Sequence, residues 1–330
     1  MDKLIDKFNR QIDYLRISVT DRCNLRCIYC MPAGGILNKE QSEILSFEEI
    51  YRIVKASARL GIRKVRITGG EPLVRKDLPV LITKLKNISG LREIALTTNG
   101  TYLNDYAYSL KRAGLDRVNV SLDTLDPQKY QEITRGGKIE TVLKGIESAF
   151  SAGLFPVKIN SVLMKGFNAD EILDFARLAK EMPLHVRFIE YMCTGSNRID
   201  NEDFYLSSLK AKQACQSLGE LIPVKSVLST TAEVFKIKGF CGTIGFISPI
   251  SRPFCSSCNK LRLTSDGLLK SCLHSPEIVN LKEALTRGIG DEELANLIRK
   301  AVSLKPASHN LLNAQVTYET ADFSMCQIGG

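Results

Sequence analysis

The chain has 330 residues, of which 44% are hydrophobic and 25% are charged, a balance typical of a folded globular protein with a sizeable core. Its formal net charge of +9 predicts anionic partners, such as a nucleotide, another phosphorylated substrate or a nucleic acid. The sequence has no Trp, no dense Lys/Arg run and no aromatic interleaving of the kind that RNA-binding sheets use, so we expect no dedicated nucleic-acid surface.

Targeting signals are not evident in the sequence. Residues 1–14 alternate charged with apolar side chains, which argues against a secretory signal. No apolar run reaches 18 residues, so we expect no membrane span. Ten cysteines in an exported protein would indicate disulfides, but without an export signal we expect reduced thiols in a cytoplasmic protein, available to a metal.

The first predicted strand spans residues 14–20, and three cysteines follow it within eight residues: Cys23, Cys27 and Cys30. Their spacing differs from that of common zinc pairs. Three thiolates would leave one iron of a four-iron cluster without a protein ligand, and such an open position is where a small molecule can bind and react. The motif therefore predicts a reactive iron–sulfur cluster, with chance clustering as the alternative.

Strand-like and helix-like runs then alternate along the chain. Further strands are predicted at residues 64–68, 93–99, 117–123, 156–162 and 185–192. Amphipathic helices are predicted at residues 46–60, 77–87, 104–113, 139–152 and 169–181, and three of them end at a glycine, as a helix C-terminus favours. Six such units predict an α/β fold with a parallel sheet, an incomplete (βα)6 barrel rather than the complete eightfold one.

Several of these strands alternate apolar with polar side chains, whereas strands of a parallel sheet usually read as continuous Val, Ile and Leu. Arg16, for example, stands between Leu15 and Ile17. If the apolar faces meet the helices, the polar faces line the barrel interior. Buried charges are costly unless a partner or ligand compensates them, so we expect Arg16, Arg66 and Lys158 to bind an anion there. An edge or solvent-facing sheet is the alternative.

A Gly-Gly-Glu-Pro turn, Gly69 to Pro72, follows the second strand. Its two glycines allow the backbone to approach a ligand closely, and the Glu-Pro pair stiffens the turn. By itself such a turn is weak evidence, but it lies at the carboxyl end of a barrel strand, where ligands of barrels bind.

After residue 220 the pattern changes to short strands and turns, with strands predicted at residues 233–238, 243–248, 260–264 and 268–273. We therefore expect a barrel over residues 1–220 and a C-terminal extension of short strands and helices over residues 221–330. The extension carries a second cysteine set, Cys255, Cys258 and Cys272. With His274 nearby, a Cys3His zinc site and an iron–sulfur cluster are equally compatible with this spacing. The remaining cysteines, Cys193, Cys215, Cys241 and Cys326, are expected to be ordinary buried thiols.

The first cysteine motif, with Tyr29 between its last two cysteines, and the Gly-Gly-Glu-Pro turn on a six-unit barrel resemble the radical S-adenosylmethionine superfamily. More narrowly, the run at residues 246–264, the following Asp266-Gly267 and Ser271-Cys272-Leu273, and the terminal Gly329-Gly330 resemble the GTP 3′,8-cyclase family of molybdenum cofactor biosynthesis. The resemblance covers essentially the whole chain.

The resemblance implies two [4Fe–4S] clusters, the first binding S-adenosylmethionine and the second anchoring the guanine of GTP. It implies that the cofactor contacts are Tyr29, Gly70, Ser121 and Met192. It implies that the GTP contacts are Arg16, Arg66, Thr97, Lys158, Lys260, Leu261 and Arg262. It also implies catalytic roles for Arg262, Gly329 and Gly330, the two glycines reaching into the barrel to aid radical control. A frayed terminus is the default alternative for the glycines.

The implied chemistry is hydrogen abstraction from the ribose 3′ carbon of GTP, followed by attack of that carbon on guanine carbon 8. Reduction and protonation would give (8S)-3′,8-cyclo-7,8-dihydroguanosine 5′-triphosphate. The resemblance further implies a reduced flavodoxin- or ferredoxin-type electron donor and product transfer to a cyclic pyranopterin monophosphate synthase, and a homodimer is one option for the assembly.

The sequence departs from the family pattern at two positions. Lys260 stands where Arg is expected, which keeps the charge but loses the bidentate fork, and Cys193 stands where Pro is expected. Two other functions remain open at this point. A radical enzyme that modifies peptides would share the first motif but usually brings more C-terminal cysteines and a peptide-binding extension. A zinc- or cluster-stabilised binding module would have no enzymatic activity.

Overall fold

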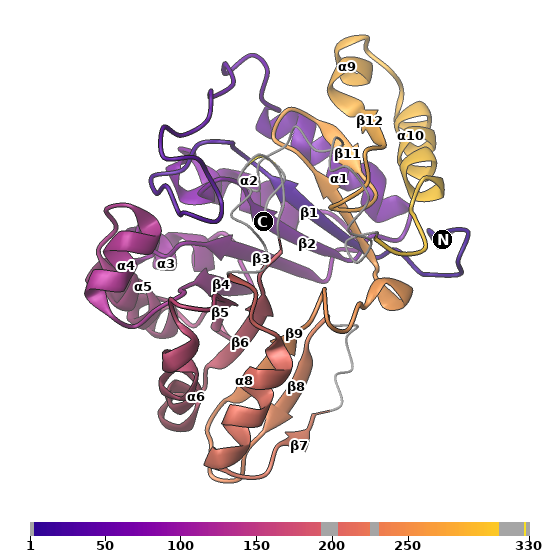
Figure 1. Cartoon of the computed structure of the whole chain (residues 1–330). Coiled ribbons are helices and arrows are strands. Elements are labelled where there is room, and N and C mark those ends of the chain that lie inside the picture. Colours follow the sequence, from indigo (N-terminus) through magenta and orange to yellow (C-terminus); the bar gives the residue numbers. More distant parts are fainter. Residues whose placement is uncertain (1–2, 193–203, 225–230, 310–326, 328–330) are drawn as a thin grey trace.

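A single open sheet organises the chain. The computed structural model describes residues 3–192, 204–224, 231–309 and 327. Across these residues twelve strands form one sheet in the order β12-β11-β10-β1-β2-β3-β4-β5-β6-β9-β8-β7, whose end strands do not pair with each other (Figure 1). The predicted incomplete barrel is therefore confirmed.

The six predicted barrel strands are all present and run parallel in sequence order. They are β1 (Tyr14–Ser18), β2 (Lys64–Thr68), β3 (Glu93–Thr98), β4 (Arg117–Ser121), β5 (Lys158–Leu163) and β6 (His185–Glu190). Strands β1, β4 and β6 end two residues before their predicted ends, and β5 begins two residues after its predicted start.

The five predicted helices cover the outer face of the sheet (Figure 1). They are α1 (Phe47–Arg59), α2 (Leu78–Lys86), α3 (Leu103–Arg112), α5 (Ile139–Ser151) and α6 (Ile172–Glu181). A further helix, α4 (Pro127–Thr134), was not predicted; the Asp126 side chain caps it by accepting hydrogen bonds from two backbone N–H groups. None of the described helices is long and apolar enough to cross a membrane.

The two faces of the barrel strands differ as their alternation predicted. Leu15 and Ile17 of β1, Val65 of β2 and Val118 of β4 are fully buried in the core between sheet and helices. Their polar neighbours in sequence point to the other face, since successive side chains of a strand alternate. The helices thus cover the apolar face, and the polar face lines the interior.

The C-terminal residues extend the same sheet at both edges. At one edge lie β7 (Ile222–Pro223), β8 (Glu233–Lys236) and β9 (Thr243–Ile247) (Figure 1). At the other edge lie β10 (Lys260–Leu263), β11 (Leu268–Lys270) and β12 (Ile278–Asn280), followed in the chain by α9 (Leu281–Thr286) and α10 (Asp291–Ser303). The helix α8 (Ser208–Cys215), which precedes residue 221, packs against β6 and β9. Strand β9 pairs in parallel with β6, and β10 pairs in parallel with β1. The chain therefore crosses from one edge to the other between β9 and β10, so the extension flanks the barrel on both sides.

Candidate active site

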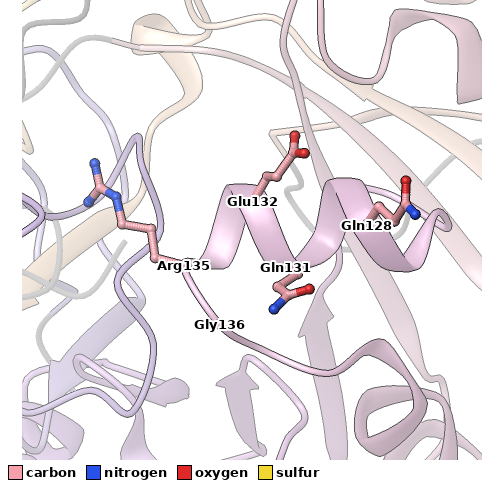
Figure 2. A pocket seen from close by; sticks show the side chains of 5 residues that line it. All are labelled: Gln128, Gln131, Glu132, Arg135 and Gly136. Carbon is pink, nitrogen blue, oxygen red and sulfur yellow. The ribbon is translucent and has the colours of Figure 1, made fainter.

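The first cysteine loop lies at the carboxyl end of β1. Backbone N–H groups of the loop donate to two carbonyls in the last turn of α4, at 2.9 and 3.0 Å. Arg135 follows that helix (Figure 2), and its guanidinium donates to two carbonyls of the loop at 2.8 and 3.0 Å. The unpredicted helix therefore fixes the backbone that presents Cys23, Cys27 and Cys30.

Tyr29 joins this loop to the end of β4. Its hydroxyl donates to Asp123 Oδ2 at 2.6 Å, and the other carboxylate oxygen accepts from the Val162 N–H at 2.8 Å. Burial raises the pKa of Asp123 to about 6, although both hydrogen bonds favour its charged form. Burial, followed by the nearby Asp123 charge, raises the pKa of Tyr29 well above its ordinary value, so the phenol stays a proton donor.

The Gly-Gly-Glu-Pro turn packs against the same loop. A Cβ on Gly70 would lie 2.2 Å from the Arg22 carbonyl oxygen, and one on Gly69 would lie 2.7 Å from the Thr20 carbonyl oxygen. The close approach that the glycines allow is thus to the cysteine loop. Glu71 accepts from the Asn99 N–H and the Thr98 hydroxyl, both at 2.7 Å, and from the Leu73 N–H at 3.0 Å.

Cationic side chains gather on the interior face of the strands. The register places Arg16 of β1 between Arg66 of β2 and Arg262 of β10. Further along the sheet, Lys158 of β5 lies opposite His185 of β6. The interior cations are Arg16, Arg66, Arg117, Lys158, Arg187, Lys260 and Arg262.

Arg117 has a carboxylate partner, because its guanidinium lies 2.6 Å from Glu93. Among the described residues, no carboxylate lies within ion-pair distance of Arg66, Lys158 or Arg187. Removal from water, then repulsion by neighbouring cations, lowers the pKa of Lys158 to about 6 and that of Arg187 to about 9. The interior therefore holds excess positive charge, which an anion would stabilise.

Several interior polar atoms also lack a hydrogen bond. Arg66 Nε, Thr97 Oγ1, Asn119 Nδ2 and Asn160 Oδ1 are buried without a partner in the described part of the chain. They lie on four consecutive strands, β2 to β5. Buried polar groups are nearly always hydrogen-bonded, so this band has the donors and acceptors that a polar ligand would satisfy.

The sequence predicted Arg16, Arg66, Thr97 and Lys158 as site residues, and the alternation placed Asn119 and Asn160 on the polar strand faces that line the interior. Arg117 and Arg187 were missed, although the same two-residue alternation could have found them. Arg187, for example, stands between Val186 and Phe188, which are both fully buried on the outer face.

The second cysteine set lies at the opposite end of the strands. Cys255 and Cys258 directly precede β10, which is parallel to β1, and Cys272 follows β11, which is antiparallel to β10. All three therefore reach the amino ends of the barrel strands, whereas the first set lies at their carboxyl ends. The separation is about the length of a five-residue strand, roughly 17 Å. The interior cations lie between the two sets.

Electrostatics at this second set favours a thiolate. Burial would raise the pKa of Cys258, but the ammonium groups of Lys305 and Lys260 outweigh it, and the pKa is lowered below its ordinary value. Burial lowers the pKa of Lys260 to about 7, because it disfavours the charged ammonium form. His274 packs against the His309 ring, with ring centroids 5.5 Å apart.

No group of three or more His, Cys, Asp or Glu side chains converges on one metal ion within the described residues. A mononuclear zinc site would need such convergence. In a four-iron cluster each cysteine binds a different iron, so its ligands can lie further apart. The donor set of three thiols, with a lowered pKa at Cys258, fits a cluster.

The remaining predicted residues have varied surroundings. Ser121 ends β4 on the interior face, in register with Asn160, and Met192 is half-buried just after β6. Leu261 is fully buried in the core opposite Leu15, so only its backbone faces the site. Gly329, Gly330, Cys193 and Cys326 lie outside the described residues. Of the other cysteines, Cys215 is buried as predicted, but the prediction for Cys241 was wrong, because this thiol lies in an exposed turn.

A separate open pocket lies along α4 and is lined by Gln128, Gln131, Glu132, Arg135 and Gly136 (Figure 2). None of these five is a predicted site residue. Apart from Arg135, which also holds the first cysteine loop, the lining residues have no part in the site built above.

Residues 17–179 match the family model described as the Radical SAM superfamily, and residues 184–311 match the one described as Molybdenum Cofactor Synthesis C. A GTP 3′,8-cyclase of Heliobacterium modesticaldum is 47% identical and aligns over 99% of this chain and 100% of the relative. The chain belongs to the GTP 3′,8-cyclase family. A second member, from Moorella thermoacetica, is 48% identical over 98% of this chain and 99% of the relative.

Solved structures agree on the fold. Streptococcus suis SuiB bound to S-adenosylmethionine superposes with a TM-score of 0.61 at 16% identity, covering 89% of this chain and 69% of that one. At such identity the likeness shows a shared fold and nothing more.

Proposed function

We propose that this enzyme converts GTP into (8S)-3′,8-cyclo-7,8-dihydroguanosine 5′-triphosphate, an early step of molybdenum cofactor biosynthesis. The observation that carries the proposal is the cationic interior between the two cysteine sets. A triphosphate would supply the negative charge that Arg66 and Lys158 lack among the described residues, through charge-assisted hydrogen bonds, and Arg16 lies beside Arg66 on the same face.

The two cysteine sets are assigned to two [4Fe–4S] clusters, the first holding S-adenosylmethionine and the second the guanine of GTP. When bound, the first cluster and S-adenosylmethionine together supply a 5′-deoxyadenosyl radical. The loop residue Tyr29, with Gly70, Ser121 and Met192, would hold that cofactor at the carboxyl ends of the strands. Two observations favour an iron–sulfur cluster over zinc at Cys255, Cys258 and Cys272. The pKa of Cys258 is lowered, and no three His, Cys, Asp or Glu side chains of the described residues converge on a single metal ion.

The chain's own residues would act by position and by excluding water. Removal of one hydrogen atom from ribose C3′ leaves a carbon radical, and a new bond joins C3′ to guanine C8. One electron and one proton then complete the product. The interior side chains would hold C3′ and C8 close enough to react, and such positioning lowers the entropic part of the barrier. Arg262, Lys260 and the backbone of Leu261 are assigned to the guanine end, beside the second set.

The partners follow from this chemistry. A reduced flavodoxin- or ferredoxin-type protein would deliver the electrons, and a cyclic pyranopterin monophosphate synthase would consume the product. We place the enzyme in the cytoplasm, where thiols stay reduced. Gly329 and Gly330 are assigned to radical control; cyclisation that survives deletion of both would refute that assignment.

Production of 5′-deoxyadenosine tests the function. The protein would be purified without oxygen, reconstituted, reduced and incubated with S-adenosylmethionine plus GTP, ATP or no nucleotide. We expect GTP alone to stimulate 5′-deoxyadenosine formation and to give a product isobaric with GTP. Cleavage indifferent to GTP would retain the superfamily and reject the substrate, and would favour the peptide-modifying alternative.

A further inference from the structure

Lys305 is a buried lysine that the proposed chemistry does not use. It follows α10, which cannot continue through the next residue, Pro306. The side chain is only 2% exposed. Lysine is almost never so buried unless its charge is compensated, so its contacts carry information.

The ammonium of Lys305 joins the two segments that bear the second cysteine set. Nζ donates to the Lys260 carbonyl at 2.8 Å and to the Ser271 carbonyl at 2.6 Å. Lys260 is two residues after Cys258, and Ser271 directly precedes Cys272. Within the described residues no carboxylate lies at ion-pair distance from Lys305, so its charge faces two carbonyl dipoles and the Cys258 thiol.

Arg10 ties the remaining cysteine to the same segment. Its guanidinium donates to the Cys255 carbonyl at 2.8 Å and to the Pro306 carbonyl at 2.6 Å, while Asp6 holds the Nε at 2.6 Å. Residues 305 and 306 are therefore linked to the segments of all three cysteines, to two through the Lys305 side chain and to the third through Arg10. Two buried cations from distant parts of the chain determine how far apart these segments lie.

We propose that Lys305 is a positioning residue for the second cluster, holding Cys258 and Cys272 at the spacing the cluster needs and raising its reduction potential by its charge. A nearby cation stabilises the reduced, more negative state of a cluster, and net charge and hydrogen bonds are what set such potentials. The inference rests on the proposed two-cluster function.

The test compares Lys305→Met with Lys305→Arg, which keeps the charge, and with Lys300→Met, the same substitution at an exposed position of α10. Full-length proteins would be reconstituted without oxygen, and iron and sulfide counted per chain. We expect about eight irons in the wild type and in the Lys305→Arg and Lys300→Met proteins, and about four in Lys305→Met. The first cluster would keep its electron paramagnetic resonance signal in every variant.

A second variant separates charge from folding. Lys305→Gln loses the charge but keeps N–H donors on a somewhat shorter side chain, so we expect its second cluster to assemble with a lower midpoint potential than in the wild type. A wild-type potential in Lys305→Gln, or a full iron content and unchanged potential in Lys305→Met, would overturn the inference. About four irons in the wild type itself would instead overturn the proposed second cluster.

Discussion

Lys158 gives the sharpest prediction about substrate binding. Its pKa of about 6 means that roughly 1% of the free enzyme carries a charge there at pH 8. A bound triphosphate would raise that pKa back toward the ordinary lysine value of about 10.4, since an opposite charge favours the ammonium form. Binding of GTP near pH 8 therefore takes up about one proton at this lysine.

The sign of the pH dependence follows from linkage. Because the bound complex holds one proton more than the free enzyme, the affinity falls about tenfold per pH unit between the free and bound pKa values of Lys158. Lys260, with a pKa of about 7, adds a similar contribution to the proton uptake. The contribution of Lys158 is therefore obtained by subtracting the uptake of a Lys158 variant from that of the wild type. In Lys158→Met, we expect the protein to take up about one proton less per GTP bound. The slope of log Kd against pH should likewise be smaller by about one.

Calorimetry measures this directly. GTP would be titrated without oxygen between pH 7.5 and 8.5 in two buffers of different ionisation enthalpy, and the difference in heat gives the protons taken up. Circular dichroism checks that Lys158→Met is folded. Equal proton uptake and equal slopes in the two proteins would refute the assignment of Lys158 to the triphosphate.

Three further predictions test the rest of the site. Arg187→Leu should weaken GTP binding about 10- to 100-fold, because one charge-assisted hydrogen bond is lost. The Kd of S-adenosylmethionine should stay unchanged. A GTP affinity equal to that of the wild type would remove Arg187 from the site. Gly70→Ala should lose the first cluster, because its Cβ would lie 2.2 Å from the Arg22 carbonyl oxygen. The control Gly34→Ala, whose Cβ would have no atom within 4 Å, should keep its iron. Full iron content in both variants would contradict this packing of Gly70. Tyr29→Phe leaves the buried Asp123 without its 2.6 Å hydrogen bond, which costs about 1–3 kcal/mol. The first cluster of this variant should therefore lose iron in air faster than that of the wild type, which the cluster absorbance measures.

The sequence predicted the barrel well because its signals are local. Alternation of apolar and polar residues along each strand identified both the strands and the polar interior, and glycines after the helices marked their ends. At Gly61, Gly114 and Gly153 the backbone has positive φ, which explains why glycine stands there. The helix α4 was missed because only Tyr130, Ile133 and Thr134 of its eight residues are buried, which gives too little periodicity to detect.

Long-range features of the site could not be predicted in this way. The register of β10 against β1 brings Arg262 beside Arg16, but the two residues are far apart in the sequence and no local pattern relates them. Arg10 contacts the carbonyl of Cys255, 245 residues away. Such contacts arise from the crossing of the chain between sheet edges, which only the tertiary structure shows.

Transfer of a hydrogen atom from GTP is the most direct test of the central claim. The reduced enzyme would be incubated with S-adenosylmethionine and GTP that carries deuterium at the ribose 3′ carbon, and the 5′-deoxyadenosine would be analysed by mass spectrometry. We expect the deuterium to appear in 5′-deoxyadenosine and to be missing from the cyclised nucleotide. Unlabelled 5′-deoxyadenosine, with the deuterium retained in GTP, would contradict a cyclase that abstracts this hydrogen.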